Sequence, residues 1–196
     1  MFSPEQIQTT KEEILTLLNK SPRITSSNLI NYLTTETDFF TAPASSKFHN
    51  NTSGGLADHS LKVYKLLNEK CKQFNAERLD EEGIIITGLL HDLCKVNLYY
   101  QETKYKKNSN NEWIKYNCWG IKDELPMLHG SKSVYLIQQH IKLKPVEAIM
   151  IEQHMGGRDL KDGNDFFRIC DKLPEVILMH HSDFESSMWL ERRSEE

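Results

Sequence analysis

The segment 88–95, with the sequence GLLHDLCK, constrains the fold of this chain more than any other stretch. It places His91 and Asp92 side by side, with Lys95 one turn later, in a run that is otherwise apolar. Burying such groups costs free energy unless a partner or a metal ion compensates them. The fold must therefore bring compensating side chains to this segment from elsewhere in the sequence.

Length and charge bound the class of protein. A chain of 196 residues can form one domain with a sizeable core, or one domain with a small appendage. Its net charge of −4 gives no general surface for polyanions. The first residues lack the basic region and apolar core of a signal peptide, and no apolar run approaches the ~20 residues of a membrane span. We therefore expect a cytoplasmic protein that does not bind a membrane.

The cysteine spacing excludes the common zinc-ribbon and redox motifs. The four cysteines are far apart and form no CxxC pair. We interpret them as reduced thiols, mostly in the core of a cytosolic protein. They are Cys71, Cys94, Cys118 and Cys170.

Apolar residues at helical spacing predict a mostly α protein. Ser3 is a suitable N-cap, Pro4 suits the first helical position, and the loop 41–55 is rich in Ser, Thr, Asn and Gly. Residues 98–119 differ, because aromatic-rich segments flank NSNN and predict a β-hairpin. The predicted helices span 4–20, 25–36, 56–74, 80–96, 131–142, 145–155, 164–172 and 174–191.

Several other polar residues fall on faces that the helical period turns inward. His59 shares a face with Val63 and Leu66, and His154 is aligned with Ile151. Any one inward histidine is more often a hydrogen-bonded core residue than a ligand. Together, however, histidines and carboxylates on separate helices are satisfied by a shared cation, as in helical-bundle metal sites. Mixed His and carboxylate ligation favours Mn²⁺, Fe²⁺, Co²⁺, Ni²⁺ or Zn²⁺ over Ca²⁺, with Mg²⁺ as a further possibility.

The order of these residues resembles the HD-domain metal-dependent phosphohydrolase superfamily. The resemblance covers roughly 42–190 and includes GGLADHS, GLLHDLCK, PMLHGSKS and IEQHMGG. These elements look like a small single-domain branch related to the HD domain of bacterial 3′→5′ exoribonucleases. The resemblance implies an HD-domain helical bundle over 41–196 with one inserted β-hairpin, and an N-terminal helical extension, 1–40, packed on that core. The positions that carry it are His59, His91, Asp92, His129, His154 and Asp183.

The resemblance also implies a role for each position. Four residues would hold a first divalent metal: His59, His91, Asp92 and Asp183. His129 and His154 would hold a second metal, with Asp92 bridging the two. His49 precedes the glycine pair where this branch also has a histidine, which places it near the substrate. Of His180 and His181, one would reach the pocket and the other would be structural.

These roles suggest a hydrolytic mechanism. A pair of divalent ions lowers the pKa of bound water from about 15.7 toward neutrality. Lys95 would meet a phosphate oxygen, with a salt bridge to Asp92 as its alternative role. Asp92 would orient the nucleophile, and His49 would donate a proton to the leaving group. Gly88 either leaves room beside the metal or allows close helix packing.

The hairpin suggests the kind of substrate, because its aromatic residues and lysines can stack bases and hold phosphates. The alternative is that aromatics favour strands and lysines protect strand edges from aggregation. Arg158 would grip a phosphate or serve as a solvated helix-end charge. The predicted substrate contacts are Lys95, His49, Arg158, Tyr99, Trp119 and His181.

The sequence therefore predicts a metal-dependent phosphohydrolase or phosphodiesterase acting on a nucleotide, a cyclic nucleotide or a short oligonucleotide. A 3′→5′ exonuclease is an alternative, but residues 1–40 leave no room for a separate nucleic-acid-binding domain. A di-iron oxygenase, detectable by oxygen uptake, and a nucleotide sensor that binds without turnover are further alternatives.

Overall fold

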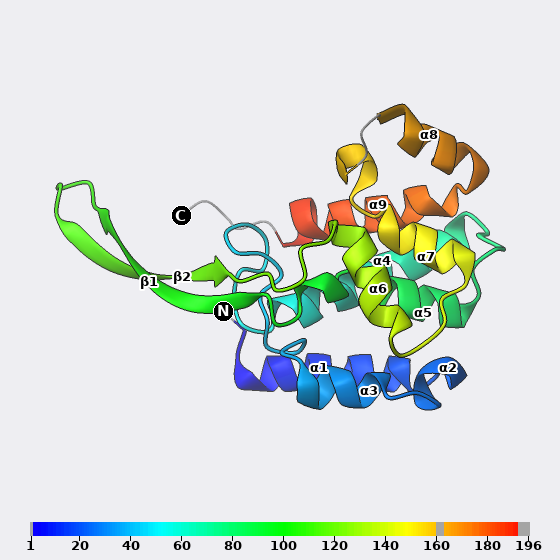
Figure 1. The fold of residues 1–196 in the computed structure, drawn as a ribbon, viewed down its shortest axis with the longest axis horizontal. Helices are drawn as coiled ribbons and strands as arrows, with labels where there is room; N and C mark the ends of the chain where they lie inside the picture. Colours follow the sequence, from blue (N-terminus) through cyan, green and yellow to red (C-terminus); the bar gives the residue numbers. More distant parts are fainter. Residues whose placement is uncertain (1, 160–162, 192–196) are drawn as a thin grey trace.

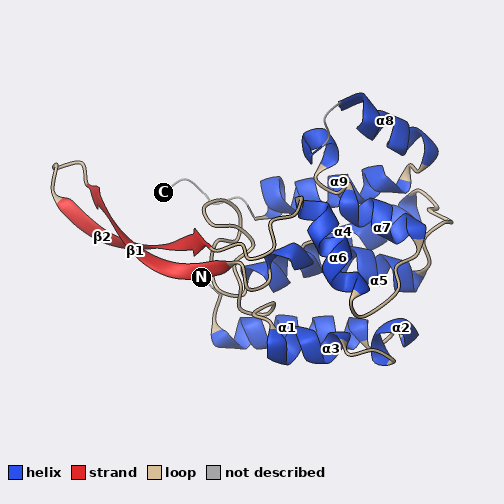
Figure 2. Ribbon diagram, viewed as in Figure 1, coloured by secondary structure: helices blue, strands red, loops and turns tan. Residues whose placement is uncertain are grey.

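The computed structural model describes residues 2–159 and 163–191 (Figure 1). A body of helices carries one β-hairpin that extends away from it (Figure 2). The predicted class, mostly α with an inserted hairpin, is confirmed. The elements are α1 (Pro4–Leu18), α2 (Pro22–Thr25), α3 (Leu29–Asn31), α4 (Gly55–Gln73), α5 (Glu81–Leu90), β1 (Tyr99–Lys107), β2 (Trp113–Ile121), α6 (His129–Gln138), α7 (Pro145–Glu152), α8 (Gly163–Lys172) and α9 (Glu175–Glu185).

The N-terminal helix α1 begins at a capping box. The Ser3 hydroxyl accepts the Gln6 N–H at 3.2 Å, and the Gln6 side chain accepts the Ser3 N–H at 2.7 Å. Ile14 and Leu18 on its inner face are fully buried. The helix packs against α4 and α5 as part of the same hydrophobic cluster. The boundary at residue 40 stays a prediction.

The single helix predicted over 25–36 is wrong. The chain forms α2, then α3, then a π-helical turn over Tyr32–Glu36. The hydroxyls of Ser26 and Ser27 donate to the carbonyls of Pro22 and Ile24, each at 2.8 Å. Serine side chains compete in this way with the backbone bonds that would continue a helix.

Helices α4 and α5 form the centre of the body and pack closely. A Cβ at Gly88 would lie 2.7 Å from the Tyr64 Cα on the facing helix. Leu89 and Leu90 beside it are fully buried. Gly88 therefore allows close packing of the two helices, which was one of its two predicted roles.

The helix predicted over 80–96 is shorter than expected. It ends at Leu90, His91 is its C-cap, and a 3₁₀ turn covers Leu93–Lys95. The Cys94 N–H donates to the Ser133 hydroxyl on α6 at 3.1 Å, not to a carbonyl one turn earlier. Asp92 therefore lies in the turn after α5 and not within a helix, as the predicted span 80–96 would have it.

The hairpin prediction is confirmed, with strands that extend two residues further. Strand β1 pairs antiparallel with β2, from Tyr99 opposite Ile121 to Lys107 opposite Trp113. Asn111, in the turn, has φ 63°, a conformation that asparagine tolerates. Among the described residues, no helix has the length and apolar character needed to cross a membrane.

Candidate metal centre

The predicted ligands come from five places in the sequence and meet in the body. His59 lies in α4, His91 and Asp92 follow α5, and His129 is the first residue of α6. His154 lies just after α7, and Asp183 lies in the last turns of α9. Four of these residues lie at or just beyond helix ends: His91, Asp92, His129 and His154. The packing of the helices fixes where those ends lie, and the side chains there meet in the body. The fully buried side chains are His59, His91 and His154, and Asp92 is 2% exposed.

One carboxylate oxygen of Asp92 faces the pair His129 and His154. Its Oδ1 accepts the His129 Nε2–H at 2.7 Å and lies 3.5 Å from His154 Nε2. The longer distance is beyond an ordinary hydrogen bond. These two histidines are those predicted for the second metal.

The other oxygen, Oδ2, faces the groups predicted for the first metal. It lies 3.4 Å from His59 Nε2 and 3.5 Å from His91 Nε2. His59 Nε2 also lies 3.2 Å from Asp183 Oδ1 and 3.3 Å from His91 Nε2. Lys95 donates to Oδ2 at 2.6 Å. Asp92 thus stands between the two predicted sets of ligands.

Backbone carbonyls fix the tautomers of two of these histidines. His91 Nδ1 donates to Gly88 O at 2.9 Å, and His154 Nδ1 donates to Ile151 O at 2.6 Å. A carbonyl oxygen can only accept, so each Nδ1 carries the proton and each Nε2 presents a lone pair to the centre. Metal-binding histidines are typically held by such a bond from the second ring nitrogen.

Glu191 holds His59 in the same way, and the sequence did not predict it. Its two carboxylate oxygens lie 3.0 and 3.2 Å from His59 Nδ1, and one accepts the Ser186 hydroxyl at 2.6 Å. Glu191 follows the π-helical turn Ser186–Leu190 and its side chain is fully buried. In the sequence it stands among charged residues, a pattern typical of a surface, so no local signal could have found it.

The geometry fits divalent cations. His154 Nε2 is buried and has no hydrogen-bond partner among the described residues. Among the described residues, four groups each bring three ligand atoms within 4.8 Å of one another: His49, His59 and Glu191; His59, His91 and Asp183; His91, Asp92 and His154; Asp92, Cys94 and His129. Ligand atoms that lie 2.0–2.2 Å from one ion are roughly 3–4 Å apart. The separations of 3.2–3.5 Å that join His59, His91, His154 and the two aspartates match this spacing.

Burial and the neighbouring charges together set the pKa values of the residues in the centre. Burial raises the pKa of Asp92, but the charge of Lys95 and the hydrogen bond from His129 outweigh it and hold that pKa well below its usual range. Burial lowers the pKa of His91 to about 3, so its ring is neutral. Burial also opposes the charged form of His59, yet its carboxylate partners raise its pKa well above the usual value.

Cys94 is buried, as predicted for the cysteines, but it also borders the centre. Its Sγ lies 3.3 Å from His129 Nδ1. Burial, followed by the charge of Asp92, raises the pKa of Cys94 to about 12, so the group is a thiol. The sequence prediction of a core thiol did not anticipate this contact, because it depends on α6 returning to the turn after α5.

Lys95 and Tyr99 lie next to the centre. Lys95 forms the salt bridge to Asp92 that was its alternative role, with 11% of its side chain exposed. Burial lowers its pKa, but the charge of Asp92 and the neighbouring Tyr99 outweigh burial and raise it. The contact of Lys95 and Tyr99 with substrate stays a prediction.

His49 lies beside His59, with ring centroids 5.0 Å apart. Its Nε2 is buried and has no hydrogen-bond partner among the described residues. Burial, together with the charges of His59 and Lys95, lowers the pKa of His49 to about 4. The ring is therefore neutral near neutral pH. Trp119 lies further out, where its indole N–H donates to Asn51 O at 2.8 Å.

One predicted substrate contact, His181, is not brought to the centre. His181 is exposed and belongs to none of the ligand groups, whereas His180 Nδ1 donates to His154 O at 2.7 Å. His180 thus supports the backbone at His154, and it is the structural member of the pair. The side chain of Arg158 lies outside the described residues.

The comparison with known families agrees with this arrangement. The family model of the HD domain matches residues 56–187, which include every predicted metal ligand. The chain belongs to the HD-domain family. This membership places it in the HD-domain metal-dependent phosphohydrolase superfamily, whose members are generally hydrolases. Searches of curated proteins and of solved structures gave no match.

Proposed function

We propose that this HD-domain protein hydrolyses a phosphate ester bond of a nucleotide, a cyclic nucleotide or a short oligonucleotide. The observation that carries the proposal is the convergence of four histidines and Asp183 around buried Asp92, with Lys95 held at 2.6 Å from its carboxylate. Such a centre needs cations to compensate it, and a lysine beside it provides a group for an anionic substrate.

His59, His91, Asp92 and Asp183 would hold one divalent ion, and His129 and His154 would hold a second, with Asp92 shared. When bound, such ions lower the pKa of water and stabilise the charge that develops on a phosphoryl group. The donor set suits Mn²⁺, Fe²⁺, Co²⁺, Ni²⁺ or Zn²⁺, with Mg²⁺ as a further possibility.

Lys95 is the positively charged side chain that the protein itself would place beside a phosphoryl group. Its ammonium is tied to Asp92 and mostly buried, so its position is fixed before substrate arrives. A preorganised charge of this kind stabilises a transition state more than a mobile surface lysine, because little reorganisation is needed.

His49 is the group that could move a proton at the leaving oxygen. In the neutral ring, its unpartnered Nε2 is either a donor or an acceptor toward the centre. An anionic phosphate close to the ring favours its protonated form and raises its pKa. The ring could then donate the proton to the leaving oxygen.

Hydrolysis should be tested at neutral pH with each candidate metal in turn. The substrates would be bis-p-nitrophenyl phosphate, mononucleotides, nucleoside triphosphates, cyclic dinucleotides and short single strands, with products read by mass spectrometry. We expect metal-dependent products from the wild type and none from His91→Ala. His140→Ala is the matched control, because its ring packs on Tyr32 with centroids 4.3 Å apart, away from the centre. Absence of turnover in a metal-loaded wild type would contradict the proposal.

The number of metal ions bound per chain tests the proposed division of the ligands between two ions. We expect two ions per chain in the wild type and one in His129→Ala, measured by elemental analysis after removal of free metal. Two ions in His129→Ala would show that this histidine is not needed for a second site.

A further inference from the structure

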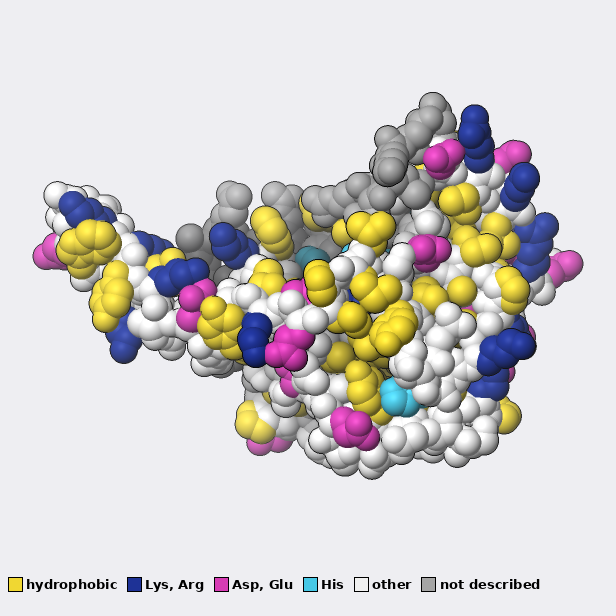
Figure 3. Space-filling view, viewed as in Figure 1, with side chains coloured by type: hydrophobic (Ala, Val, Ile, Leu, Met, Phe, Trp, Pro, Cys, Tyr) yellow, Lys and Arg dark blue, Asp and Glu magenta, His cyan; other side chains and the backbone are white. Residues whose placement is uncertain are grey.

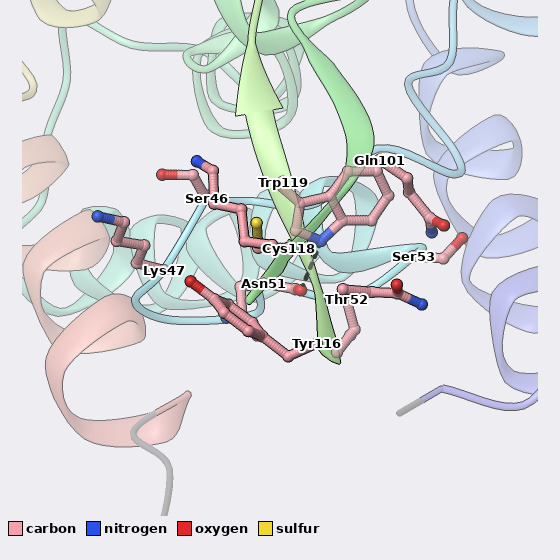
Figure 4. Close-up of a pocket in the computed structure, with 11 residues that line it drawn as sticks. Ser46, Lys47, Asn51, Thr52, Ser53, Gln101, Tyr116, Cys118 and Trp119 are labelled. Carbon is pink, nitrogen blue, oxygen red and sulfur yellow. Dashed lines mark hydrogen bonds between the residues drawn. The ribbon is translucent and has the colours of Figure 1, made fainter. Parts of the chain in front are cut away.

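A cavity of about 630 Å³ lies between the loop before α4 and the hairpin (Figure 4). Its volume is within the range of small-molecule and cofactor sites. The lining residues on which the argument depends are Lys47, Asn51, Gln101, Lys104, Tyr116 and Trp119. None of the predicted metal ligands lines this cavity, so it is a separate feature of the surface.

The cavity combines fixed aromatic surface with positive charge. The indole of Trp119 is anchored by its hydrogen bond to Asn51 O, which holds the ring in place. Lys47 is exposed and forms no ion pair within the part of the chain that is described. Lys104 pairs with Glu102 at 2.6 Å, but this pair is solvent-accessible and such pairs contribute little stability. Lys104 can therefore change partner to a phosphate at low cost.

The outer part of the hairpin continues the same chemistry. Tyr105 and Trp113 are 64% and 68% exposed. Lys106 lies 5.2 Å from the ring centroid of Tyr116, and Lys107 lies 5.7 Å from that of Trp113. Figure 3 shows Lys and hydrophobic side chains interleaved along this projection. Exposed aromatic surface on a two-stranded hairpin that projects from the body indicates an interaction site.

The charge of the hairpin is opposite to that of the whole chain. Residues 98–121 hold four lysines and two glutamates, whereas the chain has a net charge of −4. Edge lysines that only prevent aggregation need no cavity and no aromatic partners. Lysines combined with stacked rings are instead the pattern of proteins that bind single-stranded nucleic acid.

The cavity is connected to the candidate metal centre through one loop. Asn51, which anchors Trp119, is two residues from His49, so their Cα atoms are at most about 7 Å apart. The His49 ring lies beside that of His59. At the other side of the hairpin base, Tyr99 neighbours Lys95. A ligand in the cavity therefore lies close to the centre where a phosphate ester would be cut.

We propose that this cavity binds a base and phosphate of a single-stranded oligonucleotide, which continues along the hairpin and presents the next phosphodiester to the candidate metal centre. The proposal rests on the proposed function for the position of the cut. It assigns the substrate class as a short single strand and gives the hairpin the role of holding it.

Binding can be measured independently of catalysis. The probe is a fluorescein-labelled single-stranded hexanucleotide, titrated in EDTA at several salt concentrations and followed by anisotropy. We expect Lys47→Gln/Lys104→Gln to bind at least tenfold more weakly at low salt. The slope of log K against log salt should fall in magnitude by about 1.4, because each phosphate contact on a single strand contributes about 0.7.

A matched double variant controls for net charge. Lys72→Gln/Lys172→Gln removes two exposed lysines, and Lys72 lies near the C-terminal end of α4, roughly 26 Å along the helix from Gly55. This control should bind like the wild type. Equal affinity of the two double variants, or no binding of the hexanucleotide to the wild type, would overturn the proposal.

Two further variants separate stacking from catalysis. Tyr116→Ala should weaken hexanucleotide binding about tenfold or more through lost base stacking. His91→Ala should bind the hexanucleotide normally but lose hydrolysis. Normal binding without hydrolysis in the metal-loaded wild type would contradict the proposed function and leave the binding site intact. A different outcome would contradict only the proposed binding site and leave the proposed function standing. In that outcome the wild type hydrolyses mononucleotides, and Lys47→Gln/Lys104→Gln binds the hexanucleotide as tightly as the wild type does.

Discussion

Replacement of Glu191 by alanine should weaken metal binding although Glu191 is not one of the predicted ligands. Its carboxylate accepts the His59 Nδ1–H at 3.0 and 3.2 Å in a fully buried position. Removal of that acceptor frees the imidazole to rotate and leaves both Nδ1 and the Ser186 hydroxyl without this partner.

The expected loss follows from the strength of this bond. A buried hydrogen bond to a charged group contributes about 1.5–3 kcal/mol. Loss of the outer partner of a metal-binding histidine typically costs about 10–100-fold in affinity, or roughly 1.4–2.7 kcal/mol. The two ranges agree. We therefore expect Glu191→Ala to bind Co²⁺ about 10–100-fold more weakly, and Glu191→Gln, which keeps an acceptor, to lose less.

Co²⁺ binding can be followed by its visible absorption during competition with a chelator. Glu185→Ala is the matched control, because Glu185 lies in the same C-terminal region but pairs with Lys70 at 2.6 Å. Circular dichroism should verify that each variant is folded. Wild-type affinity together with an unchanged cobalt spectrum in Glu191→Ala would refute the view that Glu191 orients His59.

Three other changes test the centre and the body around it. Asp92→Ala should abolish metal binding and hydrolysis together, because both predicted sets of ligands meet at this carboxylate; retained metal and turnover would contradict its assignment. Gly88→Ala should lower the free energy of unfolding by about 1–3 kcal/mol, because its Cβ would lie 2.7 Å from the backbone of Tyr64, and urea unfolding would measure this loss. Burial raises the pKa of Glu82, but hydrogen bonds, including those from Arg23, outweigh burial and lower it below 4.5. The stabilisation is therefore present above about pH 4.5 and lost as the pH falls through the folded pKa, so Glu82→Gln should destabilise the protein at neutral pH, with a smaller difference at about pH 3. A difference independent of pH would contradict that linkage.

Arg23 shows what the sequence could not provide. It donates to Glu82 at 2.8 Å and to Glu147 at 2.7 Å, which links α2, α5 and α7. Glu147 is fully buried, yet its neighbours in the sequence give no sign that an arginine 124 residues earlier will pair with it. Such a pair depends on which helix ends meet, and local periodicity does not contain that information.

The sequence by itself indicated most of the helices, the hairpin and the residues predicted as ligands of the candidate centre. The apolar period fixed which faces of the helices are buried, and the aromatic segments around NSNN fixed the hairpin. The polar residues within buried runs, above all His91 and Asp92, required compensation wherever the chain placed them. These inferences hold because burial of an uncompensated polar group is costly in any fold.

Only the tertiary structure decided how the centre is assembled. The bond from Cys94 N–H to Ser133 ends α5 early and turns Asp92 between two sets of histidines. The C-terminal turn brings Glu191 to His59, although the two residues are 132 positions apart. These contacts join segments that are distant in the sequence, and their geometry depends on packing that helical and strand periods do not encode.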